Sequence, residues 1–227
     1  MLGFAAGVMI AASFWSLLQP AVIHAKEYLS SPPWLVVSLG FVFGAFFMWL
    51  SDKAVSRAHS VLHSAPEKTP KKTNRILLLV LSITLHNIPE GLAVGVAFGS
   101  LNNGFSTEAL MCAVTIALGI GLQNFPEGAA VSLPLRREGF SRRKSFLIGQ
   151  ASALVEPIAG VIGAATVVYI QSIMPYALSF AAGAMILVAV HELIPECQKN
   201  QQADPYFATM GIVSGFTVMM LLDIALG

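Results

Sequence analysis

Residues 85–91 read Leu-His-Asn-Ile-Pro-Glu-Gly, and residues 122–128 repeat the pattern as Leu-Gln-Asn-Phe-Pro-Glu-Gly. Each copy lies inside an apolar run of about 20 residues or more, which is the length that crosses a lipid bilayer. Polar and charged side chains are costly at that depth, and those that occur there usually have a function. The repeat therefore predicts two membrane-spanning helices that together carry a functional site.

The composition agrees with a membrane protein. Of the 227 residues, 56% are hydrophobic and 11% are charged, whereas soluble domains average about 25% charged residues. The alternative, a soluble protein with a large core, would have few charged residues to cover its surface. The formal net charge of +1 gives no indication of a nucleic-acid partner, so none is expected. The two cysteines, Cys112 and Cys197, suggest no disulfide framework.

Seven apolar segments are long enough to span the membrane, and Pro, Gly and polar stretches separate them. We therefore expect an all-α polytopic helix bundle that forms a single transmembrane domain over residues 1–227. The approximate ranges of the spans are 2–23, 33–51, 74–99, 106–133, 145–170, 174–195 and 205–226.

Lysine and arginine residues set the expected orientation of the bundle. Twelve of the 13 fall at one end of the predicted helices, and Lys26 is the exception. That end is cytoplasmic by the positive-inside rule. The segment 52–73 is therefore expected to be a cytoplasmic loop, with the N-terminus inside and the C-terminus outside.

One turn of each motif helix presents potential metal ligands on one face, because residues three and four positions apart are neighbours on a helix. A further carboxylate, followed directly by Pro157, comes from near the middle of the 145–170 segment. The candidate ligands are His86, Asn87 and Glu90 from the first motif, Gln123, Asn124 and Glu127 from the second, and Glu156.

Three carboxylates at mid-membrane would each cost about 2.5–3.5 kcal/mol to insert. Since no Lys or Arg lies deep inside a span, protons or a bound cation must neutralise them. Nitrogen and oxygen ligands without thiolate suit Zn²⁺, and also Cd²⁺, Fe²⁺, Mn²⁺ or Co²⁺. The imidazole of His86 argues mildly against Ca²⁺ and Mg²⁺. The alternative is that these side chains form interhelical hydrogen bonds without a metal.

The prolines of the two motifs coincide with the candidate ligands. Pro89 and Pro126 cannot donate a backbone hydrogen bond, so they free the carbonyls of Leu85 and Leu122 and kink each helix. Loosened backbone is tolerated at membrane depth where it is buried or lines a watery cavity. The prolines therefore favour a cavity at the level of the motifs.

A second polar group lies at the cytoplasmic end of the 174–195 segment. It consists of His191, Glu192 and Glu196, and Asp52 is expected at the same level of the second span. This group is a candidate site for metal release. The alternative is an ordinary cluster of polar residues at the membrane interface.

The motifs resemble those of the ZIP (Zrt/Irt-like) metal transporters. His-Asn-x-Pro-Glu-Gly on one helix and Gln-Asn-x-Pro-Glu-Gly on the next are similar to the family's signature, and residues 120–135 with Val155-Glu156-Pro157 are most similar to the GufA-like branch. The resemblance implies eight spans with both ends outside. The seven expected helices would then be spans two to eight, and the first span would be missing.

The resemblance also implies a two-metal centre. Carried over by position, one metal would be held by His86, Glu90, Gln123, Glu127 and Glu156, and the other by Asn87, Glu90, Asn124, Glu127 and Glu156. His191 and Glu192 match a family position associated with metal exit to the cytosol. Asn124 departs from relatives that have Asp there, which should weaken the second metal position.

These observations together predict a transporter rather than an enzyme. It would move divalent metal, with zinc as the expected substrate, toward the cytosol by alternating access around the central site. The expected location is the plasma membrane or a bacterial inner membrane, with metal ions and lipid as partners and a homodimer left open. The alternative is an intramembrane metal-dependent hydrolase, although His191-Glu192 lacks the second histidine of an HExxH motif and Pro occupies position 195.

Overall fold

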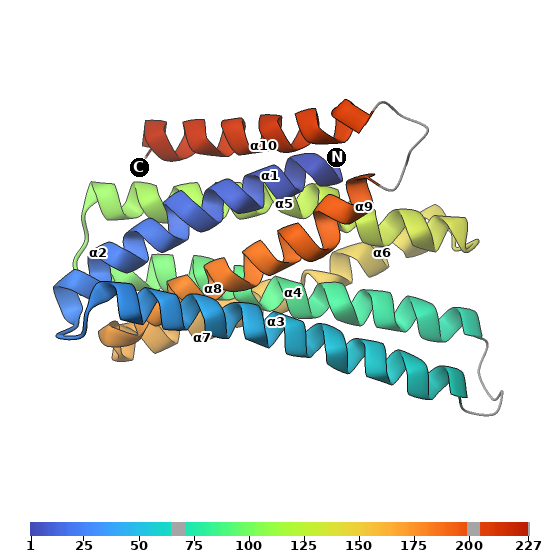
Figure 1. The fold of residues 1–227 in the computed structure, drawn as a ribbon, viewed down its shortest axis with the longest axis horizontal. Coiled ribbons are helices and arrows are strands. Elements are labelled where there is room, and N and C mark those ends of the chain that lie inside the picture. Colours follow the sequence, from blue (N-terminus) through green and yellow to red (C-terminus); the bar gives the residue numbers. More distant parts are fainter. Residues whose placement is uncertain (65–70, 199–204, 227) are drawn as a thin grey trace.

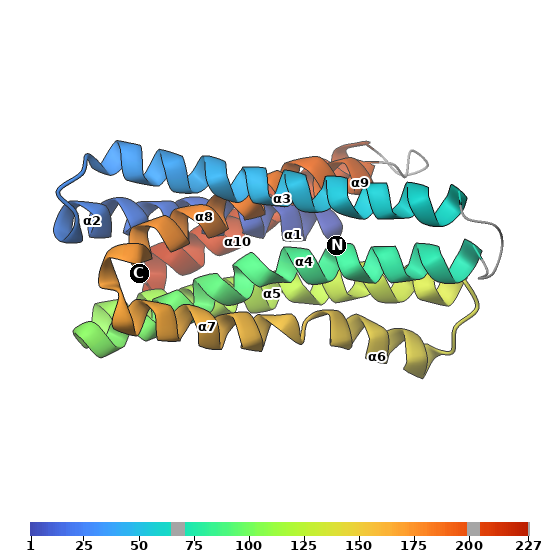
Figure 2. The same ribbon diagram turned by 90° about the horizontal axis from the view of Figure 1, so that it is seen from below.

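The computed structural model describes residues 1–64, 71–198 and 205–226, and every regular element in these ranges is a helix (Figure 1). The expected all-α fold is therefore confirmed. The elements form a bundle of long rods that lie roughly side by side, with short connections at the two ends of the bundle (Figures 1 and 2).

The first rod consists of three consecutive helical elements, namely α1 (Leu2–Ala12), the π-helical turn η1 (Ser13–Leu18) and α2 (Gln19–Tyr28). The widened turn ends two residues before Pro20, which has no N–H to donate to the carbonyl four residues earlier. The second rod is α3 (Pro33–Ser64), and Pro33 stands at its first position, where a missing N–H costs nothing.

The two motif helices are α4 (Lys71–Ser100) and α5 (Thr107–Arg137), joined through the short 3₁₀ turn η2 (Leu101–Asn103). Ser106 caps α5, because its hydroxyl oxygen accepts a hydrogen bond from the Ala109 N–H at 3.0 Å. Residues 52–73 were expected to be a loop, and of these 65–70 lie outside the described residues. On either side of them, α3 continues through Ser64 and α4 begins at Lys71. Polar residues do not stop either helix, so both rods extend beyond their apolar segments.

The remaining rods are also segmented. Two helices, α6 (Arg142–Ser152) and α7 (Val155–Tyr169), follow one another, and the 3₁₀ turn η3 (Gln171–Ile173) comes next. Another rod consists of α8 (Met174–Val188), the π-helical turn η4 (Ala189–Leu193) and α9 (Ile194–Gln198), and the last is α10 (Pro205–Leu226).

Six helical stretches of the described residues are long and apolar enough to cross a membrane. They are Leu2–Tyr28, Pro33–Arg57, Thr107–Arg136, Arg142–Tyr169, Gln171–Gln198 and Tyr206–Ala225. These match six of the seven predicted spans. The seventh, predicted over 74–99, is α4, a helix of 30 residues that lies among the others in the bundle (Figure 2). The protein therefore has the architecture of a multi-pass membrane protein.

Close helix pairs build the bundle, and the most extensive are α4 with α7, α3 with α8, and α1 with α10. Small residues allow this approach, because in lipid the association of helices depends on close packing. A Cβ placed on Gly91 would lie 2.7 Å from Glu156 Cα, and one on Gly95 would lie 2.7 Å from Gly160 Cα. The glycine of the first motif therefore sets Glu156 directly beside that motif.

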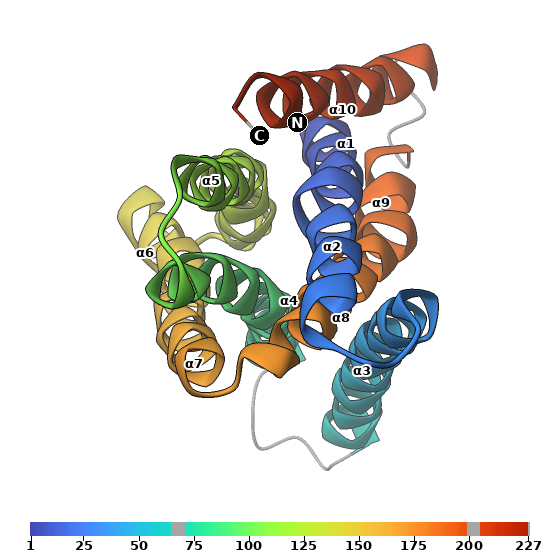
Figure 3. The same ribbon diagram turned by 90° about the vertical axis from the view of Figure 1, so that its left-hand side faces the viewer.

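The end view separates the helices into two groups (Figure 3). The motif helices α4 and α5 lie with α6 and α7 on one side. The second group consists of α3, α8 and α9 on the other side. The α1–α2 rod lies between the two groups, and α10 runs along the top of the view. All seven candidate ligands of the central site belong to the first group.

Candidate metal site

The rod that carries Glu156 is broken at the level of the motifs. A continuous helix was expected over 145–170, but α6 ends at Ser152 and α7 begins at Val155. The Glu156 N–H donates to Ala153 O at 3.0 Å, so it is not directed at the carbonyl of Ser152. Pro157 contributes to the break, because it has no N–H for the carbonyl of Ala153.

Asn87 satisfies the carbonyl that the break exposes. Its amide nitrogen donates to Ser152 O at 3.2 Å, and both groups are buried. A backbone carbonyl without a partner is costly inside a membrane. The hydrogen bond from Asn87 therefore stabilises the broken rod, and it also fixes the first motif beside the end of α6.

Amide groups of the second motif hold carboxylates from two other helices. The Gln123 amide donates from Nε2 to Glu90 Oε1 at 2.5 Å, and the Asn124 amide donates from Nδ2 to Glu156 Oε2 at 2.7 Å. Glu90 and Gln123 are almost completely buried, with 1% and 0% of their surfaces exposed. These hydrogen bonds connect the second motif with the first motif and with Glu156.

Several oxygen atoms of this group accept no hydrogen bond from the protein although they are buried. Buried polar atoms nearly always have a partner, so a concentration of exceptions calls for an explanation. They are carboxylate and side-chain amide oxygens, which bind divalent cations in proteins. They are Asn87 Oδ1, Glu90 Oε2, Gln123 Oε1, Asn124 Oδ1, Glu127 Oε1 and Glu156 Oε1.

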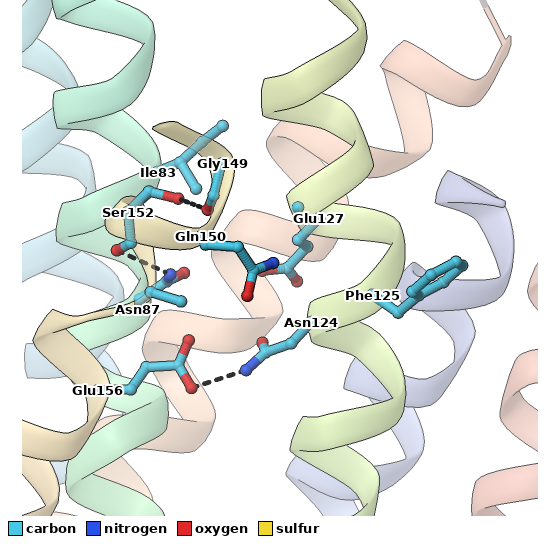
Figure 4. A pocket seen from close by; sticks show the side chains of 11 residues that line it. Ile83, Asn87, Asn124, Phe125, Glu127, Gly149, Gln150, Ser152 and Glu156 are labelled. Atoms are coloured by element: carbon cyan, nitrogen blue, oxygen red, sulfur yellow. Dashed lines mark hydrogen bonds between the residues drawn. The ribbon is translucent and has the colours of Figure 1, made fainter. Parts of the chain in front are cut away.

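Part of the group surrounds a cavity of about 230 Å³ between α4, α5 and the α6–α7 break. Figure 4 shows Asn87, Asn124, Glu127 and Glu156 around this space, with Asn124 and Glu156 pointing toward one another. His86, Glu90 and Gln123 do not line it. The cavity therefore belongs to the half of the site that contains the asparagine of each motif.

His86 takes part in a second cluster on the side of the site nearer to the ends of α3 and α9. Its Nε2 lies 3.3 Å from Asp52 Oδ1 and 3.0 Å from Glu192 Oε1. The potential ligand atoms of these three side chains all lie within 4.8 Å of one another, which is compatible with a shared metal ion. His86 therefore connects the central group with two residues of the predicted release site.

The position of Glu192 depends on a π-helical turn, since η4 contains both His191 and Glu192. Pro195 follows four residues after His191 and cannot donate to its carbonyl, which favours the wider turn. Single π turns are frequent at functional sites. His191 and Glu196 are exposed and are not part of the cluster around His86.

Comparison with known proteins identifies the family that shares these motifs. Residues 62–223 match the family model described as "ZIP Zinc transporter", and this range contains every candidate ligand except Asp52. The chain belongs to the ZIP zinc transporter family.

Individual ZIP relatives match along most of their length. The chain is 38% identical to "Zinc transporter ZIP11" of Homo sapiens, in an alignment that covers 100% of this chain and 87% of that protein. It is 33% identical to "Zinc transporter GufA" of Myxococcus xanthus, with 94% and 81% covered. The identity to "Zinc transporter ZIPB" of Bordetella bronchiseptica is 39%, with 100% and 71% covered.

Membership of the ZIP family confirms the resemblance read from the motifs. ZIP proteins are transporters and not enzymes, so the alternative of an intramembrane hydrolase finds no support. The six membrane-length stretches and the ZIP relatives together make the chain an integral, multi-pass membrane protein.

Glu90, Glu127 and Glu156 do not form a cluster as compact as the one around His86. Within the described ranges, Asp52, His86 and Glu192 are the acidic and histidine side chains that form a compact cluster of potential ligands. Glu90 and Glu156 instead receive hydrogen bonds from the amides of Gln123 and Asn124.

The sequence prediction omitted one polar side chain of the site, Gln150 on α6, which lines the cavity with Asn124 and Glu127. A glutamine inside an otherwise apolar segment was the signal that could have identified it.

Proposed function

We propose that this ZIP protein transports divalent metal, with zinc as its main substrate, across a membrane and toward the cytosol. The observation that carries the proposal is the set of buried, unpartnered oxygen atoms contributed by three different rods. Interhelical hydrogen bonds alone would not leave six acceptors without donors. A divalent cation that arrives from solution supplies the missing partner and the missing positive charge.

The central site holds metal in two adjoining positions. The first position combines the imidazole of His86 with oxygen atoms, and the second position contains oxygen atoms alone. Glu90, Glu127 and Glu156 contribute to both positions. Gln123 completes the first position, and Asn87 and Asn124 complete the second.

The connection through His86 supports movement from the central site toward the ends of α3 and α9. The same imidazole nitrogen lies within 3.3 Å of Asp52 and 3.0 Å of Glu192. A metal held by His86 can therefore pass to this pair of carboxylates without leaving protein ligands. His191 and Glu196, which are exposed beyond that point, receive the ion at the cytoplasmic end.

Alternating access fits the division of the bundle into two groups. The central ligands lie on α4, α5 and α7, whereas Asp52 and Glu192 lie on α3 and η4 in the other group. A displacement of the first group relative to the second makes or breaks the contacts of His86. Metal binding displaces protons from the glutamates, and their return accompanies release.

The donor set also accommodates Cd²⁺, Fe²⁺, Mn²⁺ and Co²⁺, because nitrogen and oxygen ligands discriminate weakly among these ions. The proposed location is the plasma membrane or a bacterial inner membrane. Residues 1–227 act as one transporter domain, and two copies can form a homodimer.

Zinc flux into sealed vesicles tests this proposal. The double variant Glu90→Ala and Glu127→Ala removes two buried carboxylates, so we expect zinc uptake by proteoliposomes to fall to the level of vesicles without protein. The control is Glu108→Ala, which removes an exposed glutamate at the first turn of α5, far from the motif on the same helix. Unchanged zinc uptake by the double variant would show that the site assignment is wrong.

A further inference from the structure

Gln150 stands out because it is a polar side chain in the apolar part of a membrane span. It lies eight residues beyond Arg142, which corresponds to about 12 Å along a helix at 1.5 Å per residue. Its surface is exposed rather than packed against a neighbouring helix. An amide transferred from water to hydrocarbon without hydrogen bonds costs about 4–8 kcal/mol. The position therefore calls for a polar partner.

The cavity supplies the polar surroundings. Gln150 lines the cavity together with Asn87, Asn124, Glu127 and Glu156. In Figure 4 its side chain extends from α6 into this space, and its amide group points toward the carboxylate of Glu127. Gln150 thus extends into the cavity of the candidate metal site.

The hydrogen bonds of the two asparagines determine which atoms this half of the site offers to a cation. Asn87 Nδ2 is engaged by Ser152 O, and Asn124 Nδ2 is engaged by Glu156 Oε2. Both amide oxygens are left without a partner, as are Glu127 Oε1 and Glu156 Oε1. This half of the site therefore offers four oxygen atoms to a cation. Two belong to amide groups and two belong to carboxylates.

We propose that Gln150 is a further oxygen ligand of this second metal position, an inference that rests on the proposed transport function. The Oε1 atom of an amide binds a cation through its lone pairs, as a carboxylate oxygen does, and adds no further negative charge beside Glu127 and Glu156. Zinc favours four ligands, whereas Mn²⁺ favours six oxygen ligands. Gln150 therefore determines how well the second position accepts ions that need more ligands than zinc.

Metal binding by the purified chain in detergent tests the inference without a transport measurement. Binding of Mn²⁺ is followed by loss of the electron paramagnetic resonance signal of the free ion, and zinc binding is followed by calorimetry. For Gln150→Ala we expect the affinity for Mn²⁺ to fall about tenfold, at the lower end of losses found when groups that support a metal site are removed. The affinity for zinc should fall less.

A matched pair of variants separates coordination from packing. Gln150→Glu keeps the shape of the side chain and adds a negative charge, so it should raise the affinity for Mn²⁺. Gln171→Ala removes an exposed glutamine from η3, well away from the site, and should change neither affinity. If Gln150→Glu weakens binding as much as Gln150→Ala does, or if neither changes it, Gln150 is not a ligand.

The variant Glu127→Ala distinguishes failure of this inference from failure of the proposed function. Suppose that Glu127→Ala weakens binding of both metals, while the Gln150 variants bind both metals as tightly as the unmodified chain. In that case only the role of Gln150 is refuted. If the unmodified chain shows no binding that depends on Glu127, both proposals are wrong.

Discussion

The glycines that end the two motifs have different surroundings, and substitution of each by alanine should have different consequences. A Cβ on Gly91 would lie 2.7 Å from Glu156 Cα, whereas ordinary contacts begin at 3.4 Å, so α4 and α7 must separate by at least 0.7 Å. Metal–ligand distances tolerate deviations of about 0.2 Å. We therefore expect Gly91→Ala to lower zinc affinity at least tenfold, the scale of loss when the supports of a metal site are disturbed.

Gly128 occupies the same motif position on α5 and lines the cavity, where a Cβ would meet nothing within 4 Å, so a methyl group there displaces no helix. Gly128→Ala should therefore preserve zinc binding and should stabilise α5 by about 0.5–1 kcal/mol, because glycine is a poor helix former. Zinc affinity from calorimetry and the midpoint of thermal unfolding in detergent measure both effects. Equal zinc affinities of the two variants would refute the reasoning that the contact between α4 and α7 positions Glu156.

Two further substitutions probe the charges of the site. Asn124→Asp adds a carboxylate to the second metal position, so the protein should bind a second equivalent of zinc more tightly, and a titration in which that affinity falls would contradict this expectation. Asp52→Asn removes the charge of one of the two carboxylates beside His86, 3.3 Å from its Nε2. It should slow zinc uptake into vesicles several-fold while zinc still binds at the central site, and Glu27→Gln in α2 serves as its control. An uptake rate equal to that of the control would exclude Asp52 from the release path.

Local spacing predicted which candidate ligands lie together on one helix, because helix geometry fixes which residues share a face. His86, Asn87 and Glu90 had to lie on one side of α4 once the segment was helical, and the same holds for the second motif. The apolar segments likewise predicted the rods, since about 20 apolar residues are needed to cross the membrane.

Contacts between rods could not be derived in the same way. His86 was assigned to the central site, yet its Nε2 lies between Asp52 and Glu192, because α3 and η4 approach α4 on that side. A continuous helix was expected through Pro157, and the sequence does not say that the rod would break there or that Asn87 would satisfy Ser152 O. Such partners depend on how closely the helices approach, which is decided by glycine contacts such as that of Gly91 with the Glu156 backbone.

The hydrogen bond from Asn87 to the broken rod gives one side chain two separate tasks. Its nitrogen is committed to Ser152 O, while its oxygen remains available to a cation. An aspartate of the same shape would bring more charge to the metal, but it has no hydrogen to give and would leave the carbonyl at the end of α6 without a donor. Position 87 therefore requires an amide for the integrity of the backbone. Any ion drawn toward its oxygen also pulls on the junction between α6 and α7, so that occupancy of the site and the shape of that junction are mechanically linked.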